Sequence, residues 1–338
     1  MPTIIGIEST AHTFGIGIVR NGKILSNKRK MYTTESGGII PMDSAKHHQE
    51  NKWEIYFEAL TEAGLNPNEE NLKKEINAIA FSQSPGLAPC LIQGKNFAIE
   101  LSKKFNKPLI GVNHCVAHLE IGRLTGCKDP VMLYASGANT QVIAYEFGKY
   151  RIFGETLDLG VGNFIDTIAR SMGLGFPGGP KIQKLAEKSS KENYIELPYT
   201  VKGQDISLSG LQTKLRQLIK SEKYKISDIA YSLQETVFAM LIETAERALA
   251  HTGKKELLLG GGVACNSRLQ EMCKIMCKER GAKFFCPEKS LLVDNAAMIA
   301  YLGEIMFKSK SNIFQPTKLN KVDILPRQRT DDIEVKWR

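Results

Sequence analysis

The sequence predicts a two-domain α/β fold in which mostly parallel sheets are flanked by helices. Three observations lead to this prediction. Short apolar runs typical of buried strands alternate with longer segments of helical periodicity. A pattern of strand, polar turn, strand, turn and strand occurs twice along the chain. The chain also has 338 residues, which is more than one ordinary hydrophobic core accommodates.

The first copy of the repeated pattern begins near the N-terminus. Strands are expected at 3–7 and 14–19 on either side of a polar turn, and Asn21-Gly22 predicts a tight turn into a third strand at 23–26. Helices and strands then alternate, which favours parallel pairing of the later strands. The expected elements are a loop at 35–38, a helix at 43–63 with Trp53, Tyr56, Phe57 and Leu60 on its apolar side, a strand at 76–81, a loop at 83–86 and a helix at 88–105.

The second copy begins at a strand expected over 131–134. Its other expected elements are a small polar turn at 135–140, a strand at 141–147, a turn at Gly148-Lys149 and a strand at 151–153. Two such units facing each other would each present a polar hairpin to the space between them. By analogy, this is the duplicated two-domain, actin-like (hexokinase-like, ASKHA) fold, with a nucleotide cleft between the domains.

The repeat also suggests where the domains divide. We expect residues 1–129, together with about 297–325, to form the first actin-like domain. Residues 130–296 would form the second domain with a helical insertion, and 326–338 would be a C-terminal tail.

Composition limits the classes of protein that need to be considered. The sequence has no run of 18 apolar residues and no charged-then-apolar leader, so we expect neither a membrane span nor a secretion signal. Its seven cysteines include no C-x-x-C pair, which argues against a zinc ribbon or a thioredoxin-like site and favours reduced thiols in a cytoplasmic protein. The net charge of +9 fits a polyanionic partner, although a solvated basic surface would look the same. The segments 26–30 and 103–107 are candidate phosphate contacts.

Two histidines four residues apart follow a short apolar run. Residues 108–112 fit a buried strand, and Asn113 fits the N-cap of a helix that begins after it. His114 and His118 would lie on one helix face, where both imidazoles can reach a single divalent metal. Cys115 would point roughly 100° away and is not expected as a third ligand. The alternative is a pair of partly buried histidines whose rings are satisfied by hydrogen bonds.

Three glycine-rich loops precede helical patterns in the second half of the chain. They span 159–163, 175–180 and 260–266. A strand, glycines and a helix in succession allow backbone N–H groups to point at a nucleotide. The loops are neither a P-loop nor a G-x-G-x-x-G fingerprint, and each glycine alone also fits a helix cap or turn. Asp166, in the helix after the first loop, has the alternative role of an exposed ion pair with Arg170.

Asp294 stands at the start of the last long helical pattern. An aspartate there is a favoured helix N-cap. A carboxylate is also a natural partner for two histidines in an open metal site. The sequence leaves both roles open.

Eight short motifs occur in a fixed order along the chain. They are 6–13, 37–41 with His47-His48, the His114 and His118 pair, 134–140, 154–158, 176–180, 260–266 and 294–297. Each motif alone is weak. In this order they resemble the family that makes threonylcarbamoyladenosine in tRNA (the TsaD group), and specifically its branch in archaea and eukaryotes, the catalytic subunit of the KEOPS complex. Residues 327–332 and Trp337-Arg338 are also similar to the archaeal branch.

The resemblance implies a specific acyl transfer. The family moves a threonylcarbamoyl group from threonylcarbamoyl-adenylate to the exocyclic amine of the adenosine just 3′ of the anticodon, in tRNAs that read codons beginning with A. The implied metal is iron or zinc, held by His114, His118, Asp294 and the phenol of Tyr134. The pocket for the adenylate, or for ATP or AMP, maps onto Tyr134, Ala135, Ser136, Gly137, Ala138, Asp166, Gly179, Gln183 and Asn266. Glu8, Ser9, Gly261 and Gly262 are expected to support these groups.

The resemblance also implies partners. Besides tRNA, the expected partners are the other KEOPS subunits, including a small atypical protein kinase and a small dimerising subunit. No association with a membrane is expected. In some archaea an equivalent domain is fused to a kinase that begins just beyond this end.

Three residues depart from the pattern of the family. Ala138 replaces a usual glycine and slightly crowds the phosphate turn. Met42 stands where an arginine usually follows Ile-Pro, which weakens a basic role there. Gln183 stands where the family usually carries an acid, although an amide can still hydrogen-bond a ribose hydroxyl.

Functions of other classes fit parts of the sequence. A metalloprotease would need a glutamate directly after the first histidine, where Cys115 stands. A small-molecule kinase fits the fold and the pocket, and a catalytic aspartate without a metal site would support it. A non-catalytic RNA-binding scaffold fits the charge. For the transfer itself, the mixed anhydride supplies the driving force, and we identify no general base from the sequence.

Overall fold

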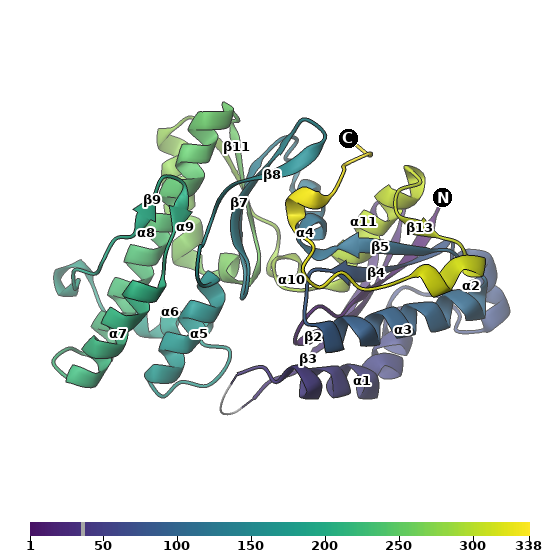
Figure 1. The fold of residues 1–338 in the computed structure, drawn as a ribbon, viewed down its shortest axis with the longest axis horizontal. Coiled ribbons are helices and arrows are strands. Elements are labelled where there is room, and N and C mark those ends of the chain that lie inside the picture. The colour runs from purple at the N-terminus through teal and green to yellow at the C-terminus, as the bar shows by residue number, and fades with distance from the viewer. Residues whose placement is uncertain (35–37) are drawn as a thin grey trace.

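Two sheets, each flanked by helices, make up most of the protein (Figure 1). The structure is a computed structural model and describes residues 1–34 and 38–338. Residues 35–37 of the expected loop lie outside the described residues, and residue 37 is also the first of the second family motif. The first sheet has the order β13-β5-β4-β1-β2-β3 and the second has the order β12-β11-β6-β7-β8.

The strands of the first sheet are β1 (Thr3–Glu8), β2 (Thr13–Arg20), β3 (Lys23–Met31), β4 (Ala78–Ser84), β5 (Leu109–Asn113) and β13 (Ile313–Phe314). Those of the second sheet are β6 (Val131–Ala135), β7 (Thr140–Glu146), β8 (Lys149–Glu155), β11 (Glu256–Gly260) and β12 (Lys283–Phe285). A separate pair is formed by β9 (Val201–Lys202) and β10 (Asp205–Ile206).

The helices are α1 (Pro41–Glu62), α2 (Glu69–Glu75), α3 (Ala88–Phe105), α4 (His114–Gly122), α5 (Val161–Ser171), α6 (Gly179–Ala186), α7 (Ser209–Ser221), α8 (Ile226–Thr252), α9 (Ser267–Glu279), α10 (Lys289–Leu292) and α11 (Ala296–Lys308). None of the helices in the described part of the chain is both long and apolar enough to cross a membrane.

The duplication predicted from the sequence is confirmed by the sheet topology. In the first sheet β1, β2 and β3 form an antiparallel meander, and β4 and β5 extend it with parallel pairing. In the second sheet β6, β7 and β8 form the meander, and β11 and β12 extend it in parallel. The sheets are therefore mixed rather than mostly parallel, because each copy opens with two hairpins.

Helix α11 brings a late part of the chain back onto the first sheet. A Cβ at Gly6 would lie 2.3 Å from the Ala300 amide nitrogen, and one at Gly17 would lie 2.4 Å from that of Ala297. The helix backbone therefore rests directly on β1 and β2, where only glycine leaves enough room. This return fits the predicted domain limits, which stay a prediction.

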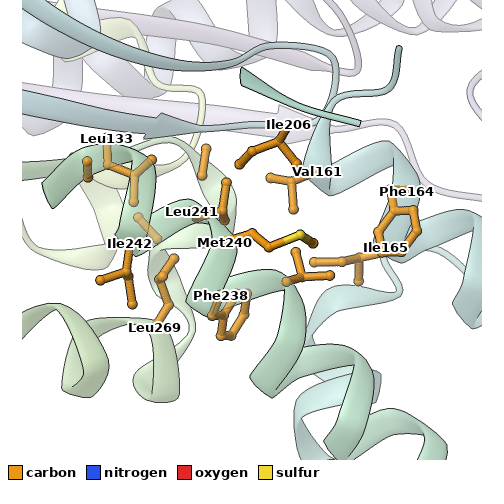
Figure 2. Packing of buried hydrophobic residues seen from close by; sticks show 14 of the residues in the cluster. Leu133, Val161, Phe164, Ile165, Ile206, Phe238, Met240, Leu241, Ile242 and Leu269 are labelled. Carbon is orange, nitrogen blue, oxygen red and sulfur yellow. The ribbon is translucent and has the colours of Figure 1, made fainter. Parts of the chain in front are cut away.

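The core of the second domain holds α5 against α8. Figure 2 shows Val161, Phe164 and Ile165 of α5 near Met240 and Leu241 of α8, all buried in one cluster. This packing fixes the start of α5, which lies against the turn between β6 and β7. The turn belongs to the candidate site described below.

Three expectations about the first domain need correction. Phe57 does not face the core, since its side chain is 50% exposed. Helix α2 was not expected, although Asn68 caps it by accepting hydrogen bonds from Glu70 N and Asn71 N. Strand β3 continues to Met31, because pairing with β2 extends it beyond its apolar part.

The C-terminal tail contacts both halves of the molecule. Leu325 N donates to the Gln83 carbonyl oxygen at the end of β4, while Val335 N donates to the Gly148 carbonyl oxygen between β7 and β8. The tail ends on α4, where Trp337 Nε1 donates to the fully buried carboxylate of Glu120 at 2.8 Å.

Candidate active site

The histidine pair lies at the point where β5 ends and α4 begins. Asn113 caps α4, as the sequence predicts, by accepting a hydrogen bond from Val116 N at 3.1 Å. His114 and His118 then occupy one face of the helix, with ring centroids 4.8 Å apart. Both side chains are buried.

Asp294 joins the histidines from the loop before α11. Its Oδ1 lies 3.4 Å from His114 Nε2 and 3.6 Å from His118 Nε2. The three side chains each offer one ligand atom, and these atoms lie within 4.8 Å of one another. Residues almost 180 positions apart in the sequence thus meet in one cluster that could hold a metal ion.

The helix-cap alternative for Asp294 is wrong. The N-cap of α11 is the next residue, Asn295, whose side chain accepts a hydrogen bond from Met298 N at 3.0 Å. The side-chain nitrogen of Asn295, Nδ2, also donates to the carbonyl oxygens of Leu291 and Val293. Asn295 therefore fixes the loop, and the carboxylate of Asp294 is left to face the histidines.

Glu8 at the end of β1 holds the far side of the His114 ring. Its Oε2 lies 2.9 Å from His114 Nδ1, and its Oε1 accepts hydrogen bonds from the amide and the hydroxyl of Thr10. Because a carboxylate only accepts hydrogen bonds, Nδ1 carries the proton and Nε2 is turned toward Asp294. Arg29 of β3 holds the segment before α11, since its Nη1 donates to the carbonyl oxygens of Ser290 in α10, at 2.7 Å, and of Asp294, at 3.4 Å.

The charges in the cluster perturb one another. Burial alone would lower the pKa of His114, but the carboxylates of Glu8 and Asp294 raise it well above its ordinary value. Burial opposes ionisation of Asp294, yet the nearby His114 and His118 hold its pKa well below the usual range. Burial lowers the pKa of His118, so this imidazole is neutral. A neutral buried histidine beside a carboxylate is the state that binds a metal.

The two histidines are not equally satisfied by hydrogen bonds. His114 has Glu8 as a partner, whereas the buried Nε2 of His118 has no hydrogen-bond partner in the described part of the chain. The alternative of two hydrogen-bonded core histidines therefore does not describe His118. An unpartnered buried nitrogen aimed at a shared point is expected of a ligand atom.

Tyr134 lies beside this cluster at the end of β6. Its ring centroid is 5.2 Å from that of His118, and burial raises the pKa of its phenol well above the ordinary value. Cys115 is buried but does not belong to the cluster, as its direction on the helix predicts.

The turn between β6 and β7 closes against the start of α5. Gly162 N donates to the Ser136 carbonyl oxygen and Asn163 N donates to that of Gly137. Both amides at the helix start are thus used within the protein. The amides of Gly137 and Ala138 have no partner among residues 1–34 and 38–338, so the turn itself carries the free donors.

Two other residues predicted for the pocket make hydrogen bonds outside this turn. Asp166 accepts a hydrogen bond from Gly178 N at 2.7 Å, directly before Gly179, and burial raises its carboxyl pKa. It forms no ion pair with Arg170 in the described part of the chain, so that alternative is wrong. Gln183 donates to Ser267 Oγ at 2.9 Å, which places it beside Asn266.

Several of these residues have structural duties that the sequence did not suggest. Asn266 caps α9 and also donates to Gln234 Oε1 at 2.9 Å. Gly261 has φ of 86°, and a Cβ there would lie 2.4 Å from the Ala135 carbonyl oxygen. A Cβ at Gly262 would make only an ordinary contact, 3.9 Å from Val293 Cγ1. Ser9 is fully buried, and its hydroxyl has no hydrogen-bond partner among the residues that the structure describes.

Sequence reasoning missed Thr10, Arg29 and Asn295. The position of Asn295 directly before a helical pattern was a usable signal for a cap. Arg29 gave no such signal, because it stands in a basic run that suggested phosphate contacts.

Comparisons with known proteins agree with this geometry. The TsaD family model, described as tRNA N6-adenosine threonylcarbamoyltransferase, matches residues 23–301. A relative of the same description from Thermococcus sibiricus is 53% identical over 333 residues, covering 98% of this chain and 99% of the relative. A "Probable tRNA N6-adenosine threonylcarbamoyltransferase" from Nematostella vectensis is 47% identical and is covered completely.

One relative is longer than this chain. It is a "Probable bifunctional tRNA threonylcarbamoyladenosine biosynthesis protein" from Methanosarcina mazei, 49% identical over 99% of this chain but only 59% of its own length.

Solved structures support the fold. HypF from T. kodakarensis matches 94% of this chain with a TM-score of 0.63 and 15% identity, and the chain spans about half of it, 49%. Component A of the Acidaminococcus fermentans (R)-2-hydroxyglutaryl-CoA dehydratase matches 90% with a TM-score of 0.53. These likenesses concern the fold alone, which is the predicted duplicated actin-like one.

The family model covers most of the chain, and the matching relatives come from both archaea and a eukaryote. The chain belongs to the TsaD family of tRNA N6-adenosine threonylcarbamoyltransferases.

Proposed function

We propose that this protein transfers the threonylcarbamoyl group of threonylcarbamoyl-adenylate to the exocyclic amine of the adenosine next to the anticodon on its 3′ side. Its substrates would be tRNAs that read codons beginning with A. The observation that carries the proposal is the cluster of His114, His118 and Asp294 beside the turn 135–140 in a chain of this family. Family membership favours this function over a small-molecule kinase or a metalloprotease.

The residues of the cluster fit a divalent metal. Two imidazoles and a carboxylate are a donor set suited to iron or zinc, and the buried Nε2 of His118 has no other partner. Tyr134 would add a phenol oxygen from the neighbouring strand. The metal, when bound, would act as a Lewis acid and as a template for the threonylcarbamoyl end.

The surrounding residues have separate tasks in this proposal. Glu8 keeps the proton on His114 Nδ1 and thereby fixes the orientation of the ring. The free amides of Gly137 and Ala138 would hold the negative charge of the departing adenylate. Asp166 would set the loop that contains Gly179.

The nucleotide would lie between the two domains. The residues proposed to line its pocket are Tyr134, Ala135, Ser136, Gly137, Ala138, Asp166, Gly179, Gln183 and Asn266. ATP and AMP would share this pocket with threonylcarbamoyl-adenylate because all three contain the same adenylate group. The domain limits predicted from the sequence are part of the same proposal.

Partners and location follow from the family. The protein would work in the cytoplasm within a KEOPS complex, with a small atypical protein kinase and a small dimerising subunit. The M. mazei relative, which is described as bifunctional and is longer than this chain, supports a second function acting beside this one.

A reconstituted transfer assay tests the proposal. The protein is incubated with its partner subunits, unmodified tRNA, threonine, bicarbonate, ATP and an adenylate-forming synthase, and the tRNA nucleosides are analysed by mass spectrometry. Threonylcarbamoyladenosine should form in a tRNA reading codons that begin with A and not in one reading codons that begin with G. The His114→Ala variant is the control that should form none. An unmodified tRNA from the complete wild-type mixture would contradict the proposed function.

A further inference from the structure

The first basic segment singled out in the sequence, 26–30, is largely paired within the protein. Lys28 pairs with Glu62 at 3.1 Å and Lys30 pairs with Glu54 at 3.0 Å. Arg29 is engaged with the loop before α11. The first segment is therefore largely neutralised within the protein.

The second segment lies at the wrong end of the first sheet. Lys103, Lys104 and Lys107 stand at the C-terminal end of α3 and in the connection to β5. His114 follows the opposite end of β5. The length of the strand therefore separates these lysines from the candidate active site.

A different basic surface emerges from the helices of the second domain. Helix α7 buries Leu211, Leu215 and Leu218 and contains no acidic residue. Its exposed side carries Lys214, Arg216 and Lys220. Helix α6 exposes Lys181 and Lys184, and Lys188 is exposed two residues after its end. We call the exposed set Lys181, Lys184, Lys188, Lys214, Arg216 and Lys220 the α6–α7 basic face.

The α6–α7 basic face forms no ion pairs with the described part of the chain, as is also true of Lys103, Lys104 and Lys107, but it differs from those lysines in adjoining α5. None of its six side chains lies within 4.0 Å of a carboxylate of residues 1–34 or 38–338. Elsewhere in the second domain, Arg247, Arg268 and Arg280 each pair with a glutamate. Unpaired exposed cations retain their full charge for an external partner.

The α6–α7 basic face is connected to the candidate site through α5. Helix α5 packs against both α6 and α7, and the three lie together at one end of the second domain (Figure 1). The start of α5 holds the turn 136–139 through Gly162 and Asn163. The start of α6 is tied to Asp166 by Gly178. A long ligand that reaches the turn would therefore pass close to these helices.

We propose that the α6–α7 basic face binds the phosphate backbone of the substrate tRNA. This inference rests on the proposed function, since it assigns a docking surface to that substrate. Six flexible cations spread over two helices suit a chain of regularly spaced phosphates better than one compact anion. The contacts would be to the backbone and would position the tRNA without reading its sequence.

The test compares two variants that remove equal charge. One is Lys214→Gln/Arg216→Gln/Lys220→Gln on α7, and the matched control is Lys103→Gln/Lys104→Gln/Lys107→Gln at the far end of α3. The affinity of the full-length protein for labelled unmodified tRNA is measured by fluorescence anisotropy between about 50 and 200 mM salt. Thermal unfolding and ATP affinity, measured on the same samples, should equal those of the wild type.

The α7 variant should bind tRNA at least about tenfold more weakly at low salt, and the slope of log affinity against log salt should fall by about 2 to 3. The α3 control should stay within about twofold of the wild type. Equal affinities of the α7 variant and the wild type would overturn the inference, as would an equally large loss in the α3 control. A loss confined to binding of a protein subunit would also overturn it. The proposed function is judged separately, by transfer from the wild-type protein.

Discussion

Asp294 and Asn295 are consecutive residues with different partners. The Asn295 side chain accepts a hydrogen bond from Met298 N at 3.0 Å and caps α11, whereas Asp294 Oδ1 lies 3.4 Å from His114 Nε2. Because capping belongs to Asn295, a change at Asp294 tests the metal cluster without removing the helix cap.

The Asp294→Asn variant should fold and retain α11, yet lose its metal. Replacing the carboxylate by an amide removes the anionic oxygen that divalent cations favour. We expect metal affinity to fall at least about a hundredfold, measured by elemental analysis after dialysis, with unchanged circular dichroism. The control is Asp43→Asn in the exposed first turn of α1, which should keep its metal. A fully metallated Asp294→Asn protein would show that the cluster is not the metal site.

The stability of the metal-free protein should depend on pH through His114. Burial lowers the pKa of this imidazole, but Glu8 and Asp294 raise it well above the ordinary value. Protonated His114 therefore stabilises the fold fully below about pH 6.5, the pKa of an unfolded histidine. This stabilisation is lost as the pH rises through the raised pKa of His114 in the folded protein. The advantage in free energy of unfolding over His114→Gln should shrink as the pH rises above about 6.5. Chemical denaturation across this range measures it, and a constant advantage would contradict the raised pKa.

The Glu8→Gln variant should weaken metal binding although Glu8 is not a ligand. A glutamine oxygen can still accept the Nδ1 proton of His114, but it no longer makes the imidazole a stronger electron donor. We expect metal affinity to fall about 10- to 100-fold, measured by competition with a chelating dye. In the metal-free variant, nitrogen NMR should also show a changed tautomer balance at His114. Metal affinity equal to that of the wild type would remove Glu8 from this role.

Two glycines of the proposed adenylate site should respond differently to alanine. Gly261 has φ of 86° and no space for a Cβ, whereas none of residues 1–34 and 38–338 lies within 4 Å of a Cβ at Gly179. Gly261→Ala should therefore lower the free energy of unfolding by about 2 kcal/mol or more. Gly179→Ala should change it by less than about 0.5 kcal/mol while weakening adenylate binding, measured by calorimetry. Two equally stable variants would contradict this assignment.

The lack of space for a Cβ at Gly261 changes how a Gly261→Val substitution, which the sequence alone would suggest, should be interpreted. A valine at Gly261 looks like a direct block of the nucleotide. In the structure its side chain would strike the Ala135 carbonyl oxygen first, so lost nucleotide affinity would also report a displaced turn. Gly179 is the cleaner probe of the pocket.

Local patterns predicted the fold well because each element carried its own signal. The hairpin at Asn21-Gly22 has φ of 51° and 74°, as its residue types require. The cap at Asn113 and the duplicated meanders were equally readable. The exposure of Phe57 was not, because helical periodicity alone does not show where the sheet stops covering a helix.

The sequence predicted the residue types that form the candidate site, but it did not predict all of the contacts between them. His114 and His118 share a helix, so their spacing alone brings them together. The link between Glu8 and His114 joins residues 106 positions apart, and only the parallel neighbours β1, β4 and β5 explain it. The neutralised charges of Lys28 and Lys30 likewise depend on tertiary contacts with α1.

The return of α11 onto the first sheet has a consequence for biosynthesis. The strands β1 and β2 leave the ribosome early, but the helix that covers Gly6 and Gly17 is made near the end of translation. Until then the nascent chain presents an apolar sheet face and an edge at β5 that β13 has yet to pair. We therefore expect C-terminally truncated chains to aggregate, and the growing polypeptide to depend on chaperones until its last helices emerge.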